Sequence, residues 1–223
     1  MKPHLSYLVI LMTVLFSCKK EPDVPYITMT TLQGKNGEVR IQIAGAGSVT
    51  IDWGDSSPNE THTLKRFIDY DWAFGGNYRY SHSYPEASSC IIKVTGENIT
   101  HFNCSESAIT SIDASRVTAL KLLACYKNHL ETLDVSKNIA LQMLNCGWNQ
   151  IANLDLSNNT SLFNMKCHSN NLSTEALIFL IGTLHDNTID GRYKSAGIYD
   201  NPGASAFANE EIINGWTIYS RYP

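Results

Sequence analysis

Four cysteines are the residues of this sequence whose side chains are best suited to chemistry. They recur at a fixed interval. Cys104, Cys125, Cys146 and Cys167 are each separated by 21 residues. A cysteine thiol can act as a nucleophile, ligate a metal, form half of a disulfide or fill part of a hydrophobic core. The residues around the cysteines, and the elements that position them, indicate which role applies.

The segments around these cysteines align as one repeat. Its pattern is LxxLxCxxNxLxxLDxSxN, with Ile, Phe, Met or Val in place of some leucines. A fixed period of this length is typical of a solenoid, in which each repeat forms one turn. We expect positions 1, 4 and 6 of the repeat to point inward and to stack on their counterparts in neighbouring turns. The four sulfurs would then form a ladder with rungs roughly 4.8 Å apart, the spacing of adjacent strands.

A straight ladder favours packing over chemistry. Sulfurs in a row cannot surround a zinc ion tetrahedrally. Side chains that point the same way from a regular parallel sheet rarely reach the dihedral angle of a disulfide. We therefore expect the four cysteines to be core residues, because cysteine is a small and frequently buried hydrophobe. A disulfide and a metal or catalytic site are the alternatives.

The repeats resemble bacterial leucine-rich repeats, in which an LxxLxLxxN half is followed by an LxxLDLSxN half. The resemblance covers Ile99 to about Leu172, and it implies a short right-handed solenoid of parallel strands. The repeated polar residues have structural roles in this interpretation. We expect Asn128, Asn149 and Asn170 to hydrogen bond to backbone groups in the turns, and Asp113, Asp134 and Asp155 to accept backbone N–H groups in Asx-turns. A calcium ladder along these aspartates is the alternative.

A second unit precedes the repeats. Apolar residues alternate with polar ones around Val49, Ile51 and Trp53, and again around Ile92 and Val94, with the two-residue period of half-buried strands. The combination of Trp53-Gly54-Asp55 with "YSHSYPEA" and a final "IIKVTG" strand resembles PKD-like domains, which are β-sandwiches. The resemblance covers residues 26–97, makes Cys90 a core position, and implies that the sandwich caps the first repeat.

The first residues of the chain resemble a bacterial lipoprotein signal. Lys2 precedes an apolar run from Leu5 to Phe16, which is too short to span a bilayer. Leu15-Phe16-Ser17-Cys18 resembles a lipobox, which implies that residues 1–17 are removed and that Cys18 is lipidated. Ordinary secretion with cleavage nearby is the alternative. Residues 18–25 carry two prolines and are expected to form a tether.

A C-terminal cap is expected after the repeats, over residues 173–223. Ser173 is a suitable N-cap for a helix with Leu177, Leu180, Ile181 and Leu184 at helical spacing. A strand near Gly197–Tyr199 and a turn at Asn201-Pro202-Gly203 should follow. We further predict a short helix through Phe207 and Ile212 that ends at Gly215, and then an edge strand over Trp216–Tyr219.

Composition and motifs argue against several functions. The chain has 17 Lys and Arg against 21 Asp and Glu, with a formal net charge of −4, which is unlike a nucleic-acid-binding protein. HExxH, GxSxG, CxxC and P-loop motifs are missing from the sequence. We therefore expect no enzymatic activity, no cofactor, no metal and no nucleic-acid partner.

Binding is the function that the pattern favours. Repeat positions 3, 5, 7 and 8 should project from the concave face of the solenoid or from its rim. An apolar patch with a polar rim is typical of an interaction surface, and partial packing of the same residues onto neighbouring turns is the alternative. The candidate ligand-binding residues are Leu122, Tyr126, Met143, Trp148, Lys166 and His168.

An aromatic hairpin in residues 67–84 is a second candidate surface. Ile68, Tyr70, Trp72 and Phe74 alternate before Gly75-Gly76, and Tyr78, Tyr80, His82 and Tyr84 alternate after it. Such a face either stacks on sugars or forms the core of the sandwich. Calcium binding by nearby aspartates is a further alternative to turn hydrogen bonds.

The sequence thus predicts a mainly β protein with α elements in its C-terminal cap. The domains expected are a signal peptide (1–17), a tether (18–25), a PKD-like β-sandwich (26–97), leucine-rich repeats (98–172) and a cap (173–223). The whole resembles bacterial, Bacteroidetes-like surface lipoproteins of the internalin-like kind. This resemblance implies a lipid-anchored protein of the cell envelope, expected at the outer membrane or cell surface, that recognises a protein or polysaccharide. An accessory role in a cell-envelope complex is the alternative.

Overall fold

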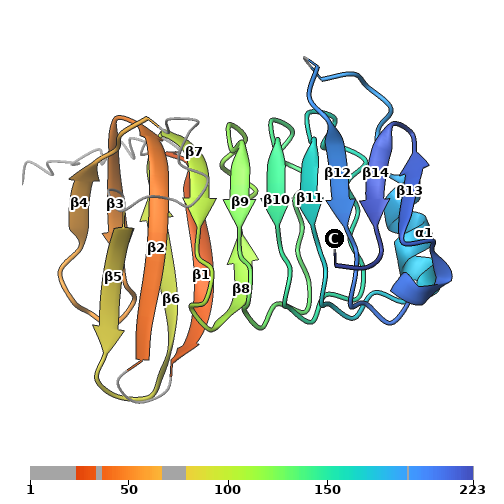
Figure 1. Ribbon diagram of the computed structural model, residues 1–223. Coiled ribbons are helices and arrows are strands. Elements are labelled where there is room, and N and C mark those ends of the chain that lie inside the picture. The colour runs from red at the N-terminus through yellow and green to blue at the C-terminus, as the bar shows by residue number, and fades with distance from the viewer. Residues whose placement is uncertain (1–23, 34–36, 67–78, 190, 223) are drawn as a thin grey trace, which may run out of the picture.

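The computed structural model describes residues 24–33, 37–66, 79–189 and 191–222. Over these residues the protein is mainly β and has a single α-helix, α1 (Thr174–Gly182). The strands form two sheets, and the larger one extends from the N-terminal sandwich to the C-terminal end of the molecule (Figure 1). The expected signal peptide, Cys18 and the aromatic residues of the hairpin up to Tyr78 lie outside the described residues.

The smaller sheet has five antiparallel strands in the order β4-β3-β6-β1-β8. Their bounds are β1 (Tyr26–Gln33), β3 (Ser48–Asp52), β4 (Glu60–Thr63), β6 (Ser88–Thr95) and β8 (Ile109–Asp113). Alternate residues of these strands point into the sandwich core, as the two-residue period predicts. Ile51, Trp53, Ile92 and Val94 are buried there, and Cys90 lies at the edge of the same core.

The larger sheet has nine strands in the order β13-β14-β12-β11-β10-β9-β7-β2-β5. Antiparallel pairs lie at its two ends, and the pairs from β7 to β14 are parallel. The bounds are β2 (Gly37–Ala46), β5 (Arg79–Tyr84), β7 (Asn98–Asn103), β9 (Leu122–Ala124), β10 (Met143–Asn145), β11 (Asn164–Lys166), β12 (Lys194–Gly197), β13 (Glu210–Ile213) and β14 (Trp216–Tyr219).

The parallel register follows the sequence period. His101 pairs with Leu122, Leu122 with Met143, and Met143 with Asn164, so that each step along the sheet is 21 residues along the chain. The next step, from Asn164 to Ser195, is 31 residues. The additional residues of this connection include α1, which lies on the side of the molecule away from the exposed face of the parallel strands.

The sandwich and the first repeat share both sheets. β7 pairs with β2 on one side and with β9 on the other, while β8 pairs with β1 in the smaller sheet. Gly45 makes this close approach possible, because a Cβ at this position would lie 2.0 Å from the carbonyl oxygen of Asn98. The hydrophobic core is consequently continuous from Ile27 at one end to Trp216 at the other.

The end of the chain confirms one expectation and corrects two. The N-cap expected at Ser173 is present, since its hydroxyl accepts the N–H of Ala176 at 3.2 Å. The predicted helix through Phe207 and Ile212 is wrong: this segment holds a one-turn 3-10 helix, η1 (Ala204–Ala206), followed by β13, which pairs with β14. Asn214 and Gly215 have φ values of 52° and 74°, which suit the Asn-Gly pair of a type I′ hairpin turn. β13, and not β14, is therefore the edge strand.

No helix in the described part of the chain is long and apolar enough to cross a membrane.

Candidate functional site

The four repeat cysteines lie in the core and not at a reactive site. Cys104, Cys125, Cys146 and Cys167 are buried, and all four are free thiols. Burial raises the pKa of Cys104 and of Cys146 to about 12, and it raises the pKa of Cys125 and Cys167 well above the usual value. The thiols are thus protonated at neutral pH, whereas a nucleophile or a metal ligand must be a thiolate.

A row of asparagines beside the cysteines holds the turns together. The side-chain amide of Asn149 donates to the carbonyl oxygens of Cys125 and Cys146, at 2.9 and 3.0 Å, and its oxygen accepts the N–H of Leu130. Asn128 and Asn170 make the equivalent bonds in their own turns. These buried side chains satisfy backbone groups that strands of only three residues leave unpaired.

Asn201 is a further member of this row, although the sequence predicts only a turn at Asn201-Pro202-Gly203. Its amide donates to the carbonyl oxygens of Cys167 and Ile198, at 3.0 and 2.7 Å. The residue before each of these asparagines has a positive φ, and so does Asp200, with φ 56°. The chain therefore makes a fifth turn of the same kind. The 31-residue spacing does not fit the 21-residue period, although "GIYDN" keeps the local pattern of the earlier turns, with Ile198 in the place of the cysteine.

The repeated aspartates lie in turns on the other half of each repeat. Asp113, Asp134 and Asp155 accept the N–H groups of Ser115, Ser136 and Ser157 at 2.8–2.9 Å. Hydrogen bonds from Ser115 and Ser136 lower the pKa of Asp113 and Asp134. This is the Asx-turn geometry expected from the sequence. Within the described residues, no group of three His, Cys, Asp or Glu side chains is arranged to hold a metal ion.

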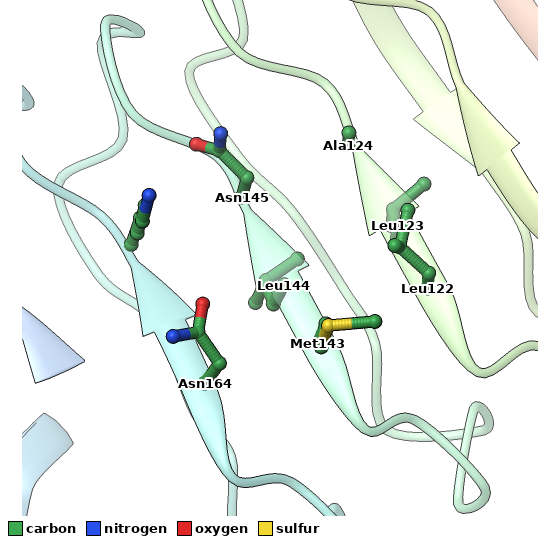
Figure 2. A pocket seen from close by; sticks show the side chains of 8 residues that line it. Leu122, Leu123, Ala124, Met143, Leu144, Asn145 and Asn164 are labelled. Carbon is green, nitrogen blue, oxygen red and sulfur yellow. The ribbon is translucent and has the colours of Figure 1, made fainter. Parts of the chain in front are cut away.

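The exposed face of the parallel strands contains a shallow pocket of about 120 Å³ (Figure 2). Apolar side chains form one part of its lining, and Asn145 and Asn164 contribute amides. Lys166 supplies a cation at one side. These residues come from three neighbouring strands. All of them except the core residues Leu123 and Leu144 occupy repeat positions that point away from the core. The full lining is Leu122, Leu123, Ala124, Met143, Leu144, Asn145, Asn164 and Lys166.

The structure brings together three of the six candidate binding residues. Leu122, Met143 and Lys166 line the pocket, whereas Tyr126, Trp148 and His168 do not. Leu122 is only 8% exposed, which agrees with the alternative that these residues pack partly onto neighbouring turns. It lies between His101 and Met143, its partners in register on the two neighbouring strands. Met143 is half-buried and Lys166 is exposed.

His168 is also buried, contrary to the expectation from its repeat position. Its ring stacks on Tyr199 with centroids 4.3 Å apart and an angle of 7°. On the other side it covers Gly147, where a Cβ would lie 2.8 Å from the His168 Nε2. Burial lowers the pKa of His168. This imidazole is therefore a packing element of the rim, and Tyr126 is half-buried in the same row of repeat positions.

Trp148 is the most exposed of the candidate residues with large apolar side chains. It is 54% exposed and has φ 52°, in the left-handed region. The turn requires this conformation, because Glu106, Lys127, Ser169 and Asp200 adopt it at the same repeat position. A bulky side chain is unfavourable there, where glycine and asparagine are preferred. Neither backbone preference nor burial accounts for a tryptophan at this position.

The described part of the aromatic hairpin belongs to the sandwich. The Tyr84 hydroxyl donates to the carbonyl oxygen of Trp53 at 2.7 Å, and the His82 ring stacks on Trp53. His82 Nε2 also lies 2.7 Å from Asp55 Oδ2. Hydrogen bonding from Ser57 and His82 lowers the pKa of Asp55 to about 2. Tyr84 and His82 thus connect β5 to the loop after β3.

Comparisons with known proteins find similarity among solved structures. No protein-family model matches the chain, and no curated protein matches it. Among solved structures, the chain is similar to the functional domain of InlJ from Listeria monocytogenes, which includes a cysteine ladder. The identity is 33% and the TM-score is 0.38, and the match covers 46% of this chain and 21% of that chain. The match thus spans about a fifth of the length of the InlJ chain.

Proposed function

We propose that the chain is a leucine-rich-repeat lipoprotein of the bacterial cell envelope, with a PKD-like sandwich as the N-terminal cap of its repeats. The 21-residue register of the parallel strands supports the repeat assignment. The hydrogen bonds between Trp53, Asp55, His82 and Tyr84 support the sandwich assignment, since they join the residues on which that resemblance rests. The lipobox-like Leu15-Phe16-Ser17-Cys18 supports the anchor.

The proposed activity is non-catalytic recognition of a protein or polysaccharide through the exposed face of β9, β10 and β11. The observation that carries it is the pocket on this face, which combines an apolar floor with two amides and a cation (Figure 2). Core packing fixes the backbone at the pocket, because Leu123 and Leu144, which are among its lining residues, are also buried in the hydrophobic core. A rigid surface of this composition favours binding, since little side-chain entropy is lost on association.

Trp148 adds to this proposal from the edge of the same strands. An exposed tryptophan is a common binding hot spot, because it offers a large apolar face and one N–H donor. The repeat turn imposes the left-handed backbone at this position, so the choice of a bulky tryptophan there favours a role outside the fold itself. The buried cysteines, in contrast, are held as protonated thiols and belong to the core.

A screen of the purified full-length protein against arrays of glycans and extracellular proteins tests this function. Met143→Glu introduces a charge into the pocket at a half-buried position. Ile139→Glu introduces the same charge at the end of the preceding repeat, at a side chain that is 60% exposed and outside the pocket lining. We expect a ligand that the wild type and Ile139→Glu bind and that Met143→Glu loses. Equal binding by all three proteins contradicts recognition through this face.

The anchor requires its own test. Cys18→Ala removes the only residue that the lipobox-like motif offers for lipidation. We expect the wild type in the membrane fraction and the variant in the soluble fraction of fractionated cells. A variant that stays in the membrane fraction contradicts lipidation at this cysteine.

A further inference from the structure

A second pocket lies where the sandwich meets the first repeats. It has a volume of about 390 Å³ and lies between the end of β2, the strand β7 and the residue before β9. Of the lining residues in the described part of the chain, three are basic and none is acidic. The lining residues are Gly45, Ala46, Arg66, Asn98, Thr100, His101 and Lys121.

Backbone hydrogen bonds bring these basic residues together from distant parts of the chain. The N–H of Lys121 donates to the carbonyl oxygen of Thr100 at 2.7 Å, which fixes Lys121 beside β7. The N–H of Gly45 donates to the carbonyl oxygen of Lys65 at 2.9 Å, which places the adjacent Arg66 at the end of β2. His101 Nδ1 lies 2.8 Å from the hydroxyl of Thr100. The pocket is thus formed by ordered elements of the fold.

The two permanent cations of the pocket are Arg66 and Lys121. Arg66 and Lys121 are both exposed, and within the described part of the chain neither side chain has a carboxylate within ion-pair distance. Two cations that converge on one depression repel each other unless an anion lies between them. A bound carboxylate or sulfate would accept hydrogen bonds from both groups.

The pocket adjoins the proposed binding face. His101 lines it and is the partner in register of Leu122, which lines the other pocket. From His101 to Asn164 the register spans three strand spacings, which is roughly 14 Å. Side-chain amides recur along this face at Asn103, Asn145 and Asn164. Amides both donate and accept hydrogen bonds, so that they suit a ligand rich in hydroxyl groups.

We propose that the ligand is an acidic glycan, with a carboxylate or sulfate group in the pocket of Arg66, His101 and Lys121. The neutral sugar rings of such a glycan extend over β9, β10 and β11. This inference rests on the proposed function, because it names the ligand class of the same face. The cations favour this ligand over a neutral polysaccharide. The side-chain amides, which suit hydroxyl groups, favour it over an acidic peptide.

Titration calorimetry of the full-length protein with defined probes tests the proposal. The probes are oligogalacturonates for the carboxylate, heparin-derived oligosaccharides for the sulfate, neutral dextran oligosaccharides and poly-L-glutamate. We expect binding of one or both acidic glycans and weaker binding of the other two probes. Lys121→Glu and Arg66→Glu should each weaken that binding roughly ten- to hundredfold. Rising salt should weaken wild-type binding as well, because the pocket is open to solvent.

The control variant is Lys137→Glu, which makes the same charge change at an exposed lysine outside both pockets. It should bind as the wild type does. Lys121→Met removes the charge without reversing it, and it replaces Lys121→Glu if circular dichroism shows that the latter does not fold. Equal losses in the Lys137 and Lys121 variants contradict a specific pocket.

The remaining outcomes separate this inference from the proposed function. Acidic glycans that fail to bind, or poly-L-glutamate that binds as tightly, overturn the acidic-glycan assignment. The proposed function still stands in that case if another ligand is bound by the wild type and lost by Met143→Glu. If no array ligand depends on Met143, both proposals fall.

Discussion

The side-chain nitrogen of Asn149 lies 2.9 Å from the carbonyl oxygen of Cys125, one full turn earlier in the repeat array. The same amide bonds Cys146 in its own turn, so that one buried side chain connects the backbones of two turns. Strands of three residues form few backbone hydrogen bonds between themselves. The asparagine row supplies the remainder, and it extends from Asn128 to Asn201.

Replacing Asn149 with alanine should therefore be costly. The variant leaves the buried N–H of Leu130 without a partner. It also removes one of the two amide donors from each of the carbonyl oxygens of Cys125 and Cys146, which keep Asn128 and Asn170. We expect a loss of about 2–4 kcal/mol in the free energy of unfolding. Asn153→Ala, at an exposed position in the same repeat, should change it by less than about 0.5 kcal/mol. Urea denaturation measures both. Similar values for the two variants would show that the row does not hold the turns together.

The cysteine ladder predicts how stability depends on alkaline pH. The pKa of the Cys146 thiol is about 12 in the folded protein, against a usual value of 9.0. The unfolded chain therefore loses this proton first, and stability falls as pH rises from about 9 to 12. Cys146→Ala should lower stability at neutral pH. Its alkaline decline should nevertheless be shallower than that of the wild type, by about 1.4 kcal/mol per pH unit.

This difference can be measured by denaturant titrations in reducing buffer at several pH values. The range from about 8 to about 11 is set by the two pKa values. Parallel alkaline declines of the wild type and Cys146→Ala would indicate that the thiol ionises in the folded protein. The ladder would then be accessible to solvent, contrary to the burial described above.

The repeats could be predicted because their spacing is regular. The turn at Asn201 and the terminal hairpin could not, because they do not follow the 21-residue period. The inward positions of each repeat, from Ile99 to Cys167, are occupied by residues that the structure buries. The fifth turn at Asn201 was missed because α1 lengthens its connection to 31 residues. The prediction of a helix through Phe207 and Ile212 is wrong because Gly215, which suits the end of a helix, here lies in a hairpin turn. The Asn214-Gly215 pair was the local signal for a hairpin.

The candidate site was harder to predict because exposure depends on neighbours. Leu122 and His168 occupy repeat positions that face outward, but side chains of adjacent turns cover them. Gly147, one turn away, leaves room for the His168 ring, because a Cβ at this position would lie 2.8 Å from its Nε2. The basic pocket was not visible in the sequence, since Arg66 and Lys121 meet only through the pairing of β2 with β7.

Asp55 predicts a change at acidic pH. Hydrogen bonding from Ser57 and His82 holds its pKa at about 2, below the usual 3.8. The unfolded chain takes up this proton at higher pH than the folded protein, so the contribution is complete above about pH 4 and is lost as pH falls to about 2. Asp55→Asn should lower stability at neutral pH and flatten the acid decline. Glu131→Gln, at an exposed position, should follow the wild type. Thermal unfolding at several pH values below 5 (on the order of the usual pKa) tests this, and an unchanged acid decline in Asp55→Asn would contradict it.

Trp148 provides the most direct test of the central claim that the chain recognises a ligand through this side of its repeats. Trp148→Asn and Lys127→Asn each place asparagine at a left-handed position, with φ values of 52° and 57° in the wild type, and each should stabilise the fold by up to about 1 kcal/mol. The measurement is thermal unfolding of both full-length variants together with their binding on glycan and protein arrays. We predict that both variants unfold at a higher temperature than the wild type and that only Trp148→Asn loses the array ligand. A Trp148→Asn protein that is more stable and binds as the wild type does would contradict the claim.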